Sequence, residues 1–228
     1  PDRMASLAHA LDIGMFVAAC LLVMAGYFCF TVIDTCAKYM SQRGLPPIEA
    51  DPPFHTASRR LILPWFSPAR VDSYEPYTRE TCRTLLDTFR HEGRADAAEQ
   101  YARQIPVRVI ATMLGISPDM ADTFTEWVLA TISAAPNDPR RDEALMEMYG
   151  FFLGEIAARQ ETPGDDLISE VLHSEIDGTP LGVDDAMGMV ILLLAAGVDT
   201  TWSSIGASLW HLATHADDRR RDRGHDAQ

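Results

Sequence analysis

The sequence is poor in cysteine and in lysine. Its 228 residues include 4 cysteines, and no two of them have the C-x-x-C spacing of a zinc site. A secreted scaffold held together by disulfides is therefore disfavoured, and a reducing compartment is favoured. Lys38 is the only lysine, so arginine supplies every other fixed positive charge.

Positive charge is scarce as well. There are 19 Lys and Arg residues against 33 Asp and Glu residues, which gives a net charge of −14 with histidine neutral. A chain of this charge is repelled by nucleic acid phosphates, so we expect no nucleic-acid partner. The hydrophobic content of 47% is enough for a sizeable core and excludes a wholly disordered chain.

Alternating strand patterns are also missing after Asp51, and the sequence therefore predicts a mainly α fold. Proline and glycine separate segments whose apolar residues have helical spacing. One expected helix begins at Ser67-Pro68 and carries Phe89, and another begins with Asp138 as its cap and Pro139 in its first turn. The remaining helices are expected at about 54–63, 97–114, 118–133, 165–174 and 183–215, and the one that begins at Pro139 extends to about 160.

The first fifty residues differ in composition from the rest. Ile13 to Ile33 are 21 consecutive residues without Asp, Glu, Lys, Arg or His. At about 1.5 Å per residue they reach across a hydrocarbon core of about 30 Å, which predicts a transmembrane helix. A cleaved signal peptide is the alternative, but the long apolar stretch and the preceding Asp12 disfavour it. The basic residues that follow Asp34 place its C-terminal side in the cytoplasm.

The stretch from Ile13 through the string DTCAKYMSQRGLPPIEA resembles the first membrane helix and the following loop of the drug/metabolite transporter superfamily. Such transporters need many spans, and this sequence has one. The change in composition instead favours a chimeric chain, with residues 1–50 of foreign origin and a junction at Ala50–Asp51.

The helix expected at 183–215 contains polar residues in apolar surroundings. Met187 to Val198 carries no charge, and at twelve residues it suits a buried helix in a globular domain better than a membrane span. Ala196-Gly197-Val198-Asp199-Thr200-Thr201 overlaps its end. A glycine inside a helix costs about 1 kcal/mol of stability relative to alanine, and a buried carboxylate without partners costs several kcal/mol more. The presence of both in this motif therefore indicates a function that compensates for the cost. Glycine would let a flat ligand approach the helix backbone. A hydroxyl that donates to the carbonyl one turn earlier can open the hydrogen-bond ladder of the helix for a water.

This motif is similar to the oxygen-activation motif of the cytochrome P450 haem-thiolate monooxygenases. Three further segments resemble the same family in its order: DPPFHTASRRLILPWFSPARV (51–71), IPVRVIATMLGIS (105–117) and DDLISEVLHSEIDG (165–178). The resemblance covers 51–216. It implies a partial cytochrome P450 fold with the helices up to and including the long central helix, and it leaves 217–228 as a frayed tail.

The resemblance implies a haem cofactor and assigns the site residues. Asp199 and Thr200 are the implied catalytic pair, which relays protons during oxygen activation. Ala196 and Gly197 are implied to border the haem and the substrate. His55 and Arg59 lie four residues apart, on one helical face, and are implied to hold a haem propionate. On spacing alone, His55 and Arg59 equally indicate a solvated basic face, and Asp199 and Thr200 also fit a capping or back-bonded pair.

The family's axial cysteine lies in a glycine-rich loop near the C-terminus, and this sequence ends before such a loop. Cys82 lies in the helical string YTRETCRTLLD, while Cys20, Cys29 and Cys36 lie in or beside the apolar span. We therefore expect a chain that is inactive alone and gives no thiolate-type Soret band. The family reaction is hydroxylation of a small apolar substrate in the cytoplasm, with O2 and with electrons from NAD(P)H through a ferredoxin or a similar redox partner.

Three functions are therefore considered: an incomplete monooxygenase, a membrane transporter fragment supported only by residues before 50, and a non-catalytic helical remnant of an enzyme. Haem uptake and a carbon monoxide spectrum separate the first from the third. His211 and His215 lie four residues apart but lack an acidic third ligand at a suitable spacing, so we predict no metal site. Cations near a helix C-terminus explain them better.

Overall fold

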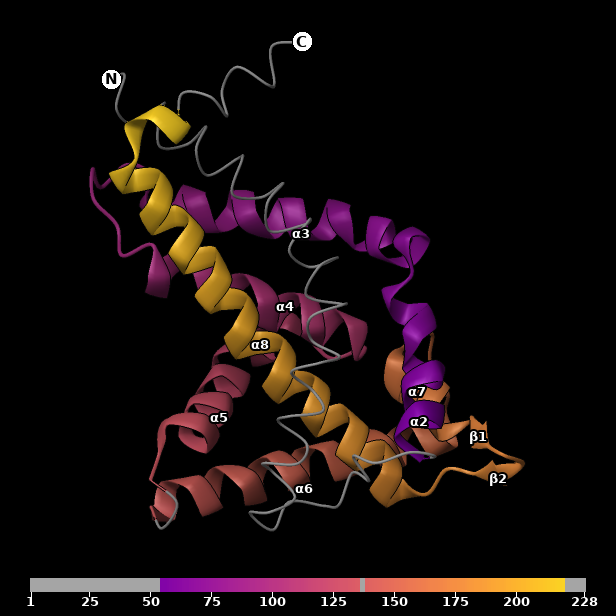
Figure 1. The fold of residues 1–228 in the computed structure, drawn as a ribbon. Coiled ribbons are helices and arrows are strands. Elements are labelled where there is room, and N and C mark those ends of the chain that lie inside the picture. The colour runs from indigo at the N-terminus through magenta and orange to yellow at the C-terminus, as the bar shows by residue number, and fades with distance from the viewer. Residues whose placement is uncertain (1–53, 136–137, 220–228) are drawn as a thin grey trace.

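A computed structural model describes residues 54–135 and 138–219, and it describes side chains from Thr56 onward. The predicted membrane helix at 13–33 and the tail beyond residue 219 lie outside these residues. The described part is mainly helical, as the sequence predicts (Figure 1). Its elements are α2 (Phe54–Ile62), η1 (Leu63–Phe66), α3 (Pro68–Phe89), η2 (Ala98–Ala102), α4 (Gln104–Met113), η3 (Pro118–Met120), α5 (Ala121–Ser133), α6 (Pro139–Glu161), α7 (Leu167–Leu172), β1 (Glu175–Ile176), β2 (Thr179–Pro180) and α8 (Val183–Thr214).

Short polar side chains fix where three of the helices begin. The carboxylate of Asp138 accepts the backbone N–H of Arg140 at 3.0 Å at the start of α6. Asp166 accepts the N–H of Ser169 at 2.8 Å at the start of α7. At α8, Asp185 accepts the N–H of Gly182 at 2.9 Å. Each bond satisfies a backbone donor at the helix end, which is why these helices begin where they do.

A small hairpin joins α7 to α8, and the sequence did not predict it. Strands β1 and β2 have two residues each and pair antiparallel, with Ile176 opposite Thr179. Two residues are too few to show an alternating pattern. The turn residues Asp177 and Gly178 have φ angles of 51° and 77°, and an Asp-Gly pair is a strong signal for such a turn.

The central helix α8 runs diagonally across the other helices (Figure 1). It packs against α4, α5, α6, α7 and η2, and every residue from Ala186 to Ala196 is buried. Among the described residues, α8 alone is long and apolar enough to cross a membrane, and 72% of its most apolar window is buried inside the protein. The prediction of a helix buried within a globular domain is therefore confirmed.

The apolar side chains form two clusters. The larger one gathers residues from α4, α5, α6, α7 and α8, including Phe124, Phe152 and Leu194, each with no exposed surface. The smaller one joins α3 and η2 to the C-terminal half of α8 and includes Cys82, Tyr101 and Ile205. The helix α8 contributes to both clusters, so its position is fixed along most of its length.

Candidate functional site

The predicted acid and alcohol lie where α8 changes from buried to half-exposed. Ala196 is 3% exposed, whereas Asp199 and Thr200 are half-buried. The Thr200 hydroxyl donates a hydrogen bond to the Ala196 carbonyl at 2.7 Å. The sequence allowed this back-bond as a purely structural contact and as a way to admit a water. The helix continues without interruption past it, so the ladder is not broken at this position.

Gly197 has a packing role that the sequence did not reveal. A Cβ atom built on Gly197 would lie 2.6 Å from Cδ1 of Ile110, a residue of α4. The missing side chain therefore lets α4 and α8 approach each other. The sequence suggested that this glycine makes room for a flat ligand, but the Cδ1 atom of Ile110 occupies the space next to its Cβ position. That Gly197 borders a haem stays a prediction.

We expect the exchange Gly197→Ala to change the free energy of unfolding by less than about 1 kcal/mol, because the gain in helix propensity offsets the contact with the flexible end of Ile110. Ile110→Val removes Cδ1, so it should cost less stability in the Gly197→Ala background than in the unaltered chain. Urea unfolding of the two single variants and the double variant measures this. Equal costs in both backgrounds would show that α4 and α8 do not meet here as described.

The predicted propionate ligands lie on α2. His55 and Arg59 both fall within Phe54–Ile62, so the predicted helix is confirmed, and Arg59 is half-buried. The side chain of His55 lies outside the described part. Helix α2 packs against η1, α7 and β1. The approach of His55 and Arg59 to one propionate therefore stays a prediction.

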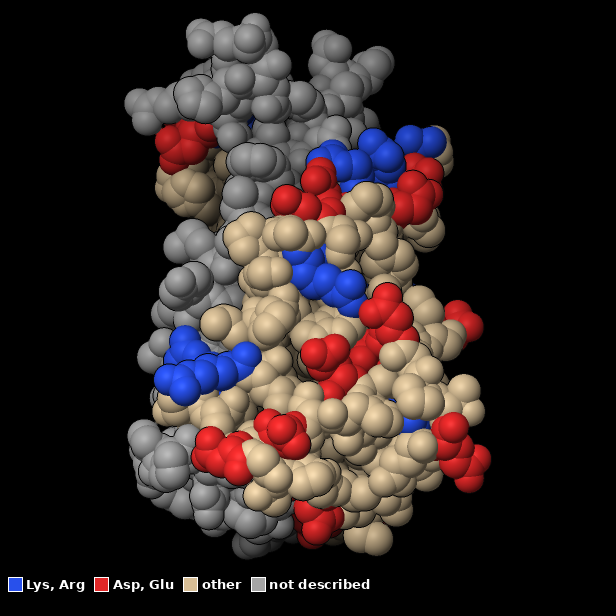
Figure 2. Space-filling view, turned by 90° about the vertical axis from the view of Figure 1, so that its right-hand side faces the viewer, with Lys and Arg blue, Asp and Glu red and all other residues tan. Residues whose placement is uncertain are grey.

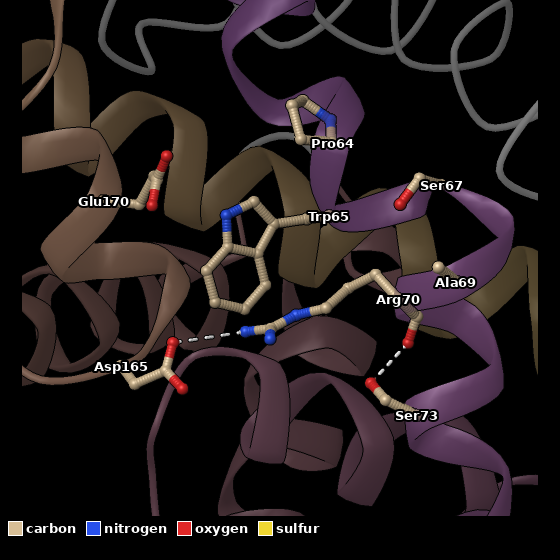
Figure 3. A pocket seen from close by; sticks show the side chains of 8 residues that line it. All are labelled: Pro64, Trp65, Ser67, Ala69, Arg70, Ser73, Asp165 and Glu170. Carbon is tan, nitrogen blue, oxygen red and sulfur yellow. Dashed lines mark hydrogen bonds and ion pairs between the residues drawn. The ribbon is translucent and has the colours of Figure 1, made fainter.

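A surface pocket of about 440 Å³ lies between η1, the start of α3 and the segment that precedes α7 (Figure 3). The guanidinium of Arg70 lies 4.1 Å from the centre of the Trp65 ring, and its Nη2 is 3.5 Å from a carboxylate oxygen of Asp165. Arg70 also donates to the Tyr74 hydroxyl at 3.2 Å. Burial raises the pKa of Tyr74 and outweighs the opposing effect of this bond, so the hydroxyl stays protonated. Of the predicted site residues whose side chains the structure describes, none lines this pocket.

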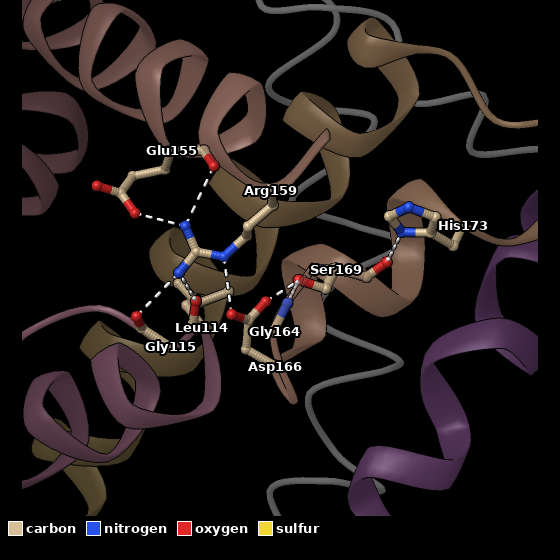
Figure 4. Close-up of polar contacts among 8 residues, drawn as sticks. All are labelled: Leu114, Gly115, Glu155, Arg159, Gly164, Asp166, Ser169 and His173. Carbon is tan, nitrogen blue, oxygen red and sulfur yellow. Dashed lines mark hydrogen bonds and ion pairs between the residues drawn. The ribbon is translucent and has the colours of Figure 1, made fainter. Parts of the chain in front are cut away.

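A buried arginine joins α6 and the start of α7 to residues 114–115, which lie far earlier in the sequence (Figure 4). Arg159 of α6 donates from Nε to Asp166 at 2.8 Å and from Nη1 to Glu155 at 2.5 Å. Its Nη2 donates to the carbonyls of Leu114 and Gly115 at 3.1 and 2.8 Å. Burial would lower the pKa of Arg159, but the hydrogen bonds to Glu155 and Asp166 outweigh it and raise the pKa. The group therefore stays charged and holds the end of α4 against the start of α7.

The role of Arg159 was not predicted, although the sequence carries a signal for it. Arg159 follows Ile156 by three residues and Phe152 by seven, which places it on the apolar face of the helix that begins at Pro139. An arginine in that position must find acceptors inside the protein. Since α7 leads directly through the hairpin into α8, the network helps to position the helix that carries Asp199 and Thr200.

The side chains of the described residues can be compared with the needs of a haem site. They include the half-exposed Asp199 and Thr200, but Cys82 is unsuited to bind iron because it has no exposed surface and packs with Phe89 and Tyr101 between α3, η2 and α8. No group of three potential metal-binding side chains occurs among the described residues. That Asp199 and Thr200 flank an oxygen-binding face stays a prediction, and no suitable iron ligand occurs among the residues that the structure describes.

The surface charge agrees with the expected absence of a nucleic-acid partner without testing it. On the face shown in Figure 2, acidic and basic side chains of the described residues are interspersed, and no continuous basic surface forms there. Long-range attraction of a polyanion to this face is therefore not favoured.

No family model matches the chain. The chain is, however, similar to curated bacterial enzymes. It is 33% identical over 171 residues to the vitamin D(3) 25-hydroxylase of Pseudonocardia autotrophica, covering 75% of this chain and 42% of that protein. It is 32% identical over 176 residues to the mycinamicin IV hydroxylase/epoxidase of Micromonospora griseorubida, covering 76% of this chain and 44% of that protein. The chain thus spans less than half the length of the relatives it matches.

Solved structures give the same result. The cytochrome P450 PksS of Bacillus subtilis 168 matches with a TM-score of 0.70 and 28% identity, over 75% of this chain and 44% of that one. The similarity includes sequence and fold together. The chain therefore belongs, over about three quarters of its length, to the cytochrome P450 family of haem monooxygenases.

Proposed function

We propose that residues 51–216 are the distal part of a cytochrome P450 monooxygenase, with Asp199 and Thr200 as its proton-relay pair. The observation that carries this proposal is the position of the pair on α8. Residues 186–196 are buried without a break, and the acid and the alcohol then follow at half-buried positions, with Thr200 tied to Ala196. An ionisable group placed at the edge of an apolar helix can exchange protons with water from one side only.

Each remaining site residue has a role in this proposal. Ala196 and Gly197 border the haem, and His55 and Arg59 hold a propionate through a charge-assisted hydrogen bond and an imidazole contact. The haem, when bound, supplies the activation of O2. Thr200 holds a water through its hydroxyl, and Asp199 passes protons from solvent to that water. The family relation supports these roles.

The substrate is a small apolar molecule, and its hydroxylation uses electrons from NAD(P)H through a ferredoxin or a similar redox partner. Residues 51–228 act in the cytoplasm, and residues 1–50 form a separate segment that associates with a membrane if the 13–33 span forms. A polypeptide with only these 228 residues is inactive alone, because none of Cys20, Cys29, Cys36 and Cys82 suits a thiolate ligand.

A hybrid enzyme tests the proton relay. Residues 183–214 of this chain would replace the matching segment of the mycinamicin IV hydroxylase/epoxidase. We expect the hybrid, reduced and treated with carbon monoxide, to show a thiolate-type Soret band, and the 228-residue chain to show none. In the hybrid, Asp199→Asn should lower kcat about 100-fold with little change in KM, because general acid–base groups contribute factors of this size. Thr200→Ala should divert electrons from product to hydrogen peroxide.

The control is Ser208→Ala. Ser208 makes the same type of back-bond as Thr200, since its hydroxyl donates to the Ser204 carbonyl at 2.8 Å, but it lies two turns further along α8. If Thr200 were only a back-bonding residue, Thr200→Ala and Ser208→Ala would give equal coupling of electrons to product. That result, together with an unchanged kcat for Asp199→Asn, would contradict the proposed function.

A further inference from the structure

The surface pocket beside Trp65 has two walls of opposite charge (Figure 3). One wall is the start of α3, which contributes Arg70. The other wall is the start of α7 and the segment before it, which contribute Glu170 and Asp165. The remaining lining residues carry no charge: Pro64, Trp65, Ser67, Ala69 and Ser73. The volume of about 440 Å³ is enough to hold a small molecule.

The guanidinium of Arg70 is held in a fixed orientation. It lies 4.1 Å from the centre of the Trp65 ring, and that residue is only 6% exposed, so the ring is itself fixed by packing. The Nε atom of Arg70 donates to the Tyr74 hydroxyl at 3.2 Å. The side chain of Arg70 nevertheless remains 34% exposed. Its two Nη atoms form a planar fork, which is the geometry that a carboxylate can accept with both of its oxygens.

The carboxylates of the opposite wall are weakly engaged. Asp165 lies 3.5 Å from Nη2 of Arg70, and its side chain is 94% exposed. Such an exposed contact stabilises a protein little, so Asp165 can exchange this partner at a small cost. Glu170 is exposed as well, and its carboxylate forms no ion pair with the residues that the structure describes. Both acids are therefore available to a ligand.

The two walls together favour a ligand that carries both charges. A simple anion at Arg70 would lie near two carboxylates, and a simple cation at these carboxylates would lie near the guanidinium. Like charges at such short range repel each other. A zwitterion avoids both repulsions, because each of its charges meets the opposite sign. Pro64 and Ala69 are exposed at the edge of the pocket and offer an apolar surface for the rest of the molecule.

From these two walls we propose that the pocket binds a zwitterionic α-amino acid with an apolar side chain. The carboxylate of the amino acid accepts the N–H groups of the Arg70 fork. Its ammonium group donates to Glu170 and to Asp165, which exchanges Arg70 for the ligand. The apolar side chain covers Pro64 and Ala69. No residue that lines this pocket belongs to α8, so the site requires neither haem nor the proton relay.

Binding of L-leucine and of two fragments of it to the full 228-residue chain, without haem, tests this site. Isopentylamine lacks the carboxylate of leucine, and isocaproate lacks its ammonium group. Heteronuclear NMR of the Trp65 indole N–H, assigned with the variant Trp65→Phe, measures the three affinities. We expect leucine to bind about 5-fold more tightly than either fragment, which corresponds to about 1 kcal/mol for each exposed ion pair.

Variants of each wall separate the two charge contacts. Arg70→Met should lower the affinity for leucine to that for isopentylamine. It should not weaken the binding of isopentylamine, which also shows that the pocket is still formed. Arg70→Lys keeps the charge without the fork and should retain part of the preference. The double variant Asp165→Asn, Glu170→Gln should lower the affinity for leucine to that for isocaproate.

The matched control is Arg79→Met. Arg79 lies on the same helix, its side chain is 39% exposed, and it pairs with Glu75 at 2.6 Å outside the pocket. This variant should leave all three affinities unchanged. Either fragment binding to the unaltered chain as tightly as leucine, or an indole signal of Trp65 that does not respond to leucine, would overturn the proposal without the need for any variant to fold. A preference for leucine over isopentylamine that survives in Arg70→Met would overturn it as well.

Discussion

Replacing Arg159 with methionine is expected to lower the free energy of unfolding by about 3–5 kcal/mol, the range for breaking one side of a buried ion pair. The side chains of Arg159 and Asp166 are 9% and 10% exposed, so the remaining carboxylate would lose its partner in surroundings that water hardly reaches. The carbonyls of Leu114 and Gly115 would lose their donor at the same time. Equilibrium unfolding in urea, followed by circular dichroism, measures the change.

The control for this prediction is Arg90→Met. Arg90 forms an exposed ion pair with Asp87 at 3.2 Å, and such pairs contribute less than about 1 kcal/mol. Asp166→Asn provides a second, milder test, because an amide oxygen can still cap α7 while the charge is lost. A variant Arg159→Met that unfolds at the same urea concentration as Arg90→Met would show that the network does not stabilise the fold.

Gly115→Ala is expected to have the second largest effect on stability and to lower the free energy of unfolding by about 2–4 kcal/mol. Gly115 has a φ angle of 68°, a left-handed conformation that costs any other residue about 1–2 kcal/mol. A Cβ atom would also lie 2.7 Å from the Cβ of Asp166 and would overlap its carboxylate. Since Arg159 and the N–H of Ser169 both hold that carboxylate, it cannot move aside without breaking their bonds.

Gly93→Ala separates the two causes. Gly93 has nearly the same backbone conformation, with a φ angle of 72°, but nothing lies within 4 Å of the position that its Cβ would take. Gly93→Ala should therefore lower the free energy of unfolding only by the backbone contribution of about 1–2 kcal/mol. Thermal and urea unfolding of the two variants side by side measure the difference. Equal losses would show that Asp166 does not crowd Gly115.

Helix positions could be predicted from the sequence because their signals are local. Asp138 and Pro139 mark the start of α6, and the uncharged run that ends at Val198 identifies α8 as a core helix. The hairpin at 175–180 was missed because its strands are shorter than any periodic pattern, although Asp177-Gly178 is a turn signal. Elements long enough to show a periodic pattern could thus be predicted, and the two-residue strands could not.

Contacts between distant residues could not be predicted in the same way. The sequence indicated a back-bond from Thr200, and the structure contains one, because that contact lies within a single helical turn. The close approach of Ile110 to Gly197 depends on how α4 and α8 cross, and no local pattern encodes that distance. The burial of Arg159 could have been predicted from the sequence, since helical spacing places it beside Ile156 on the apolar face of α6.

The central position of α8 has a consequence for how the protein is made. This helix packs against α4, α5, α6, α7 and η2, all of which precede it in the chain. During synthesis, these earlier helices leave the ribosome first, and their apolar faces stay uncovered until α8 has emerged. Closure of the core therefore waits until α8 has been synthesised, and nascent chains that stall before this helix should be preferred clients of chaperones.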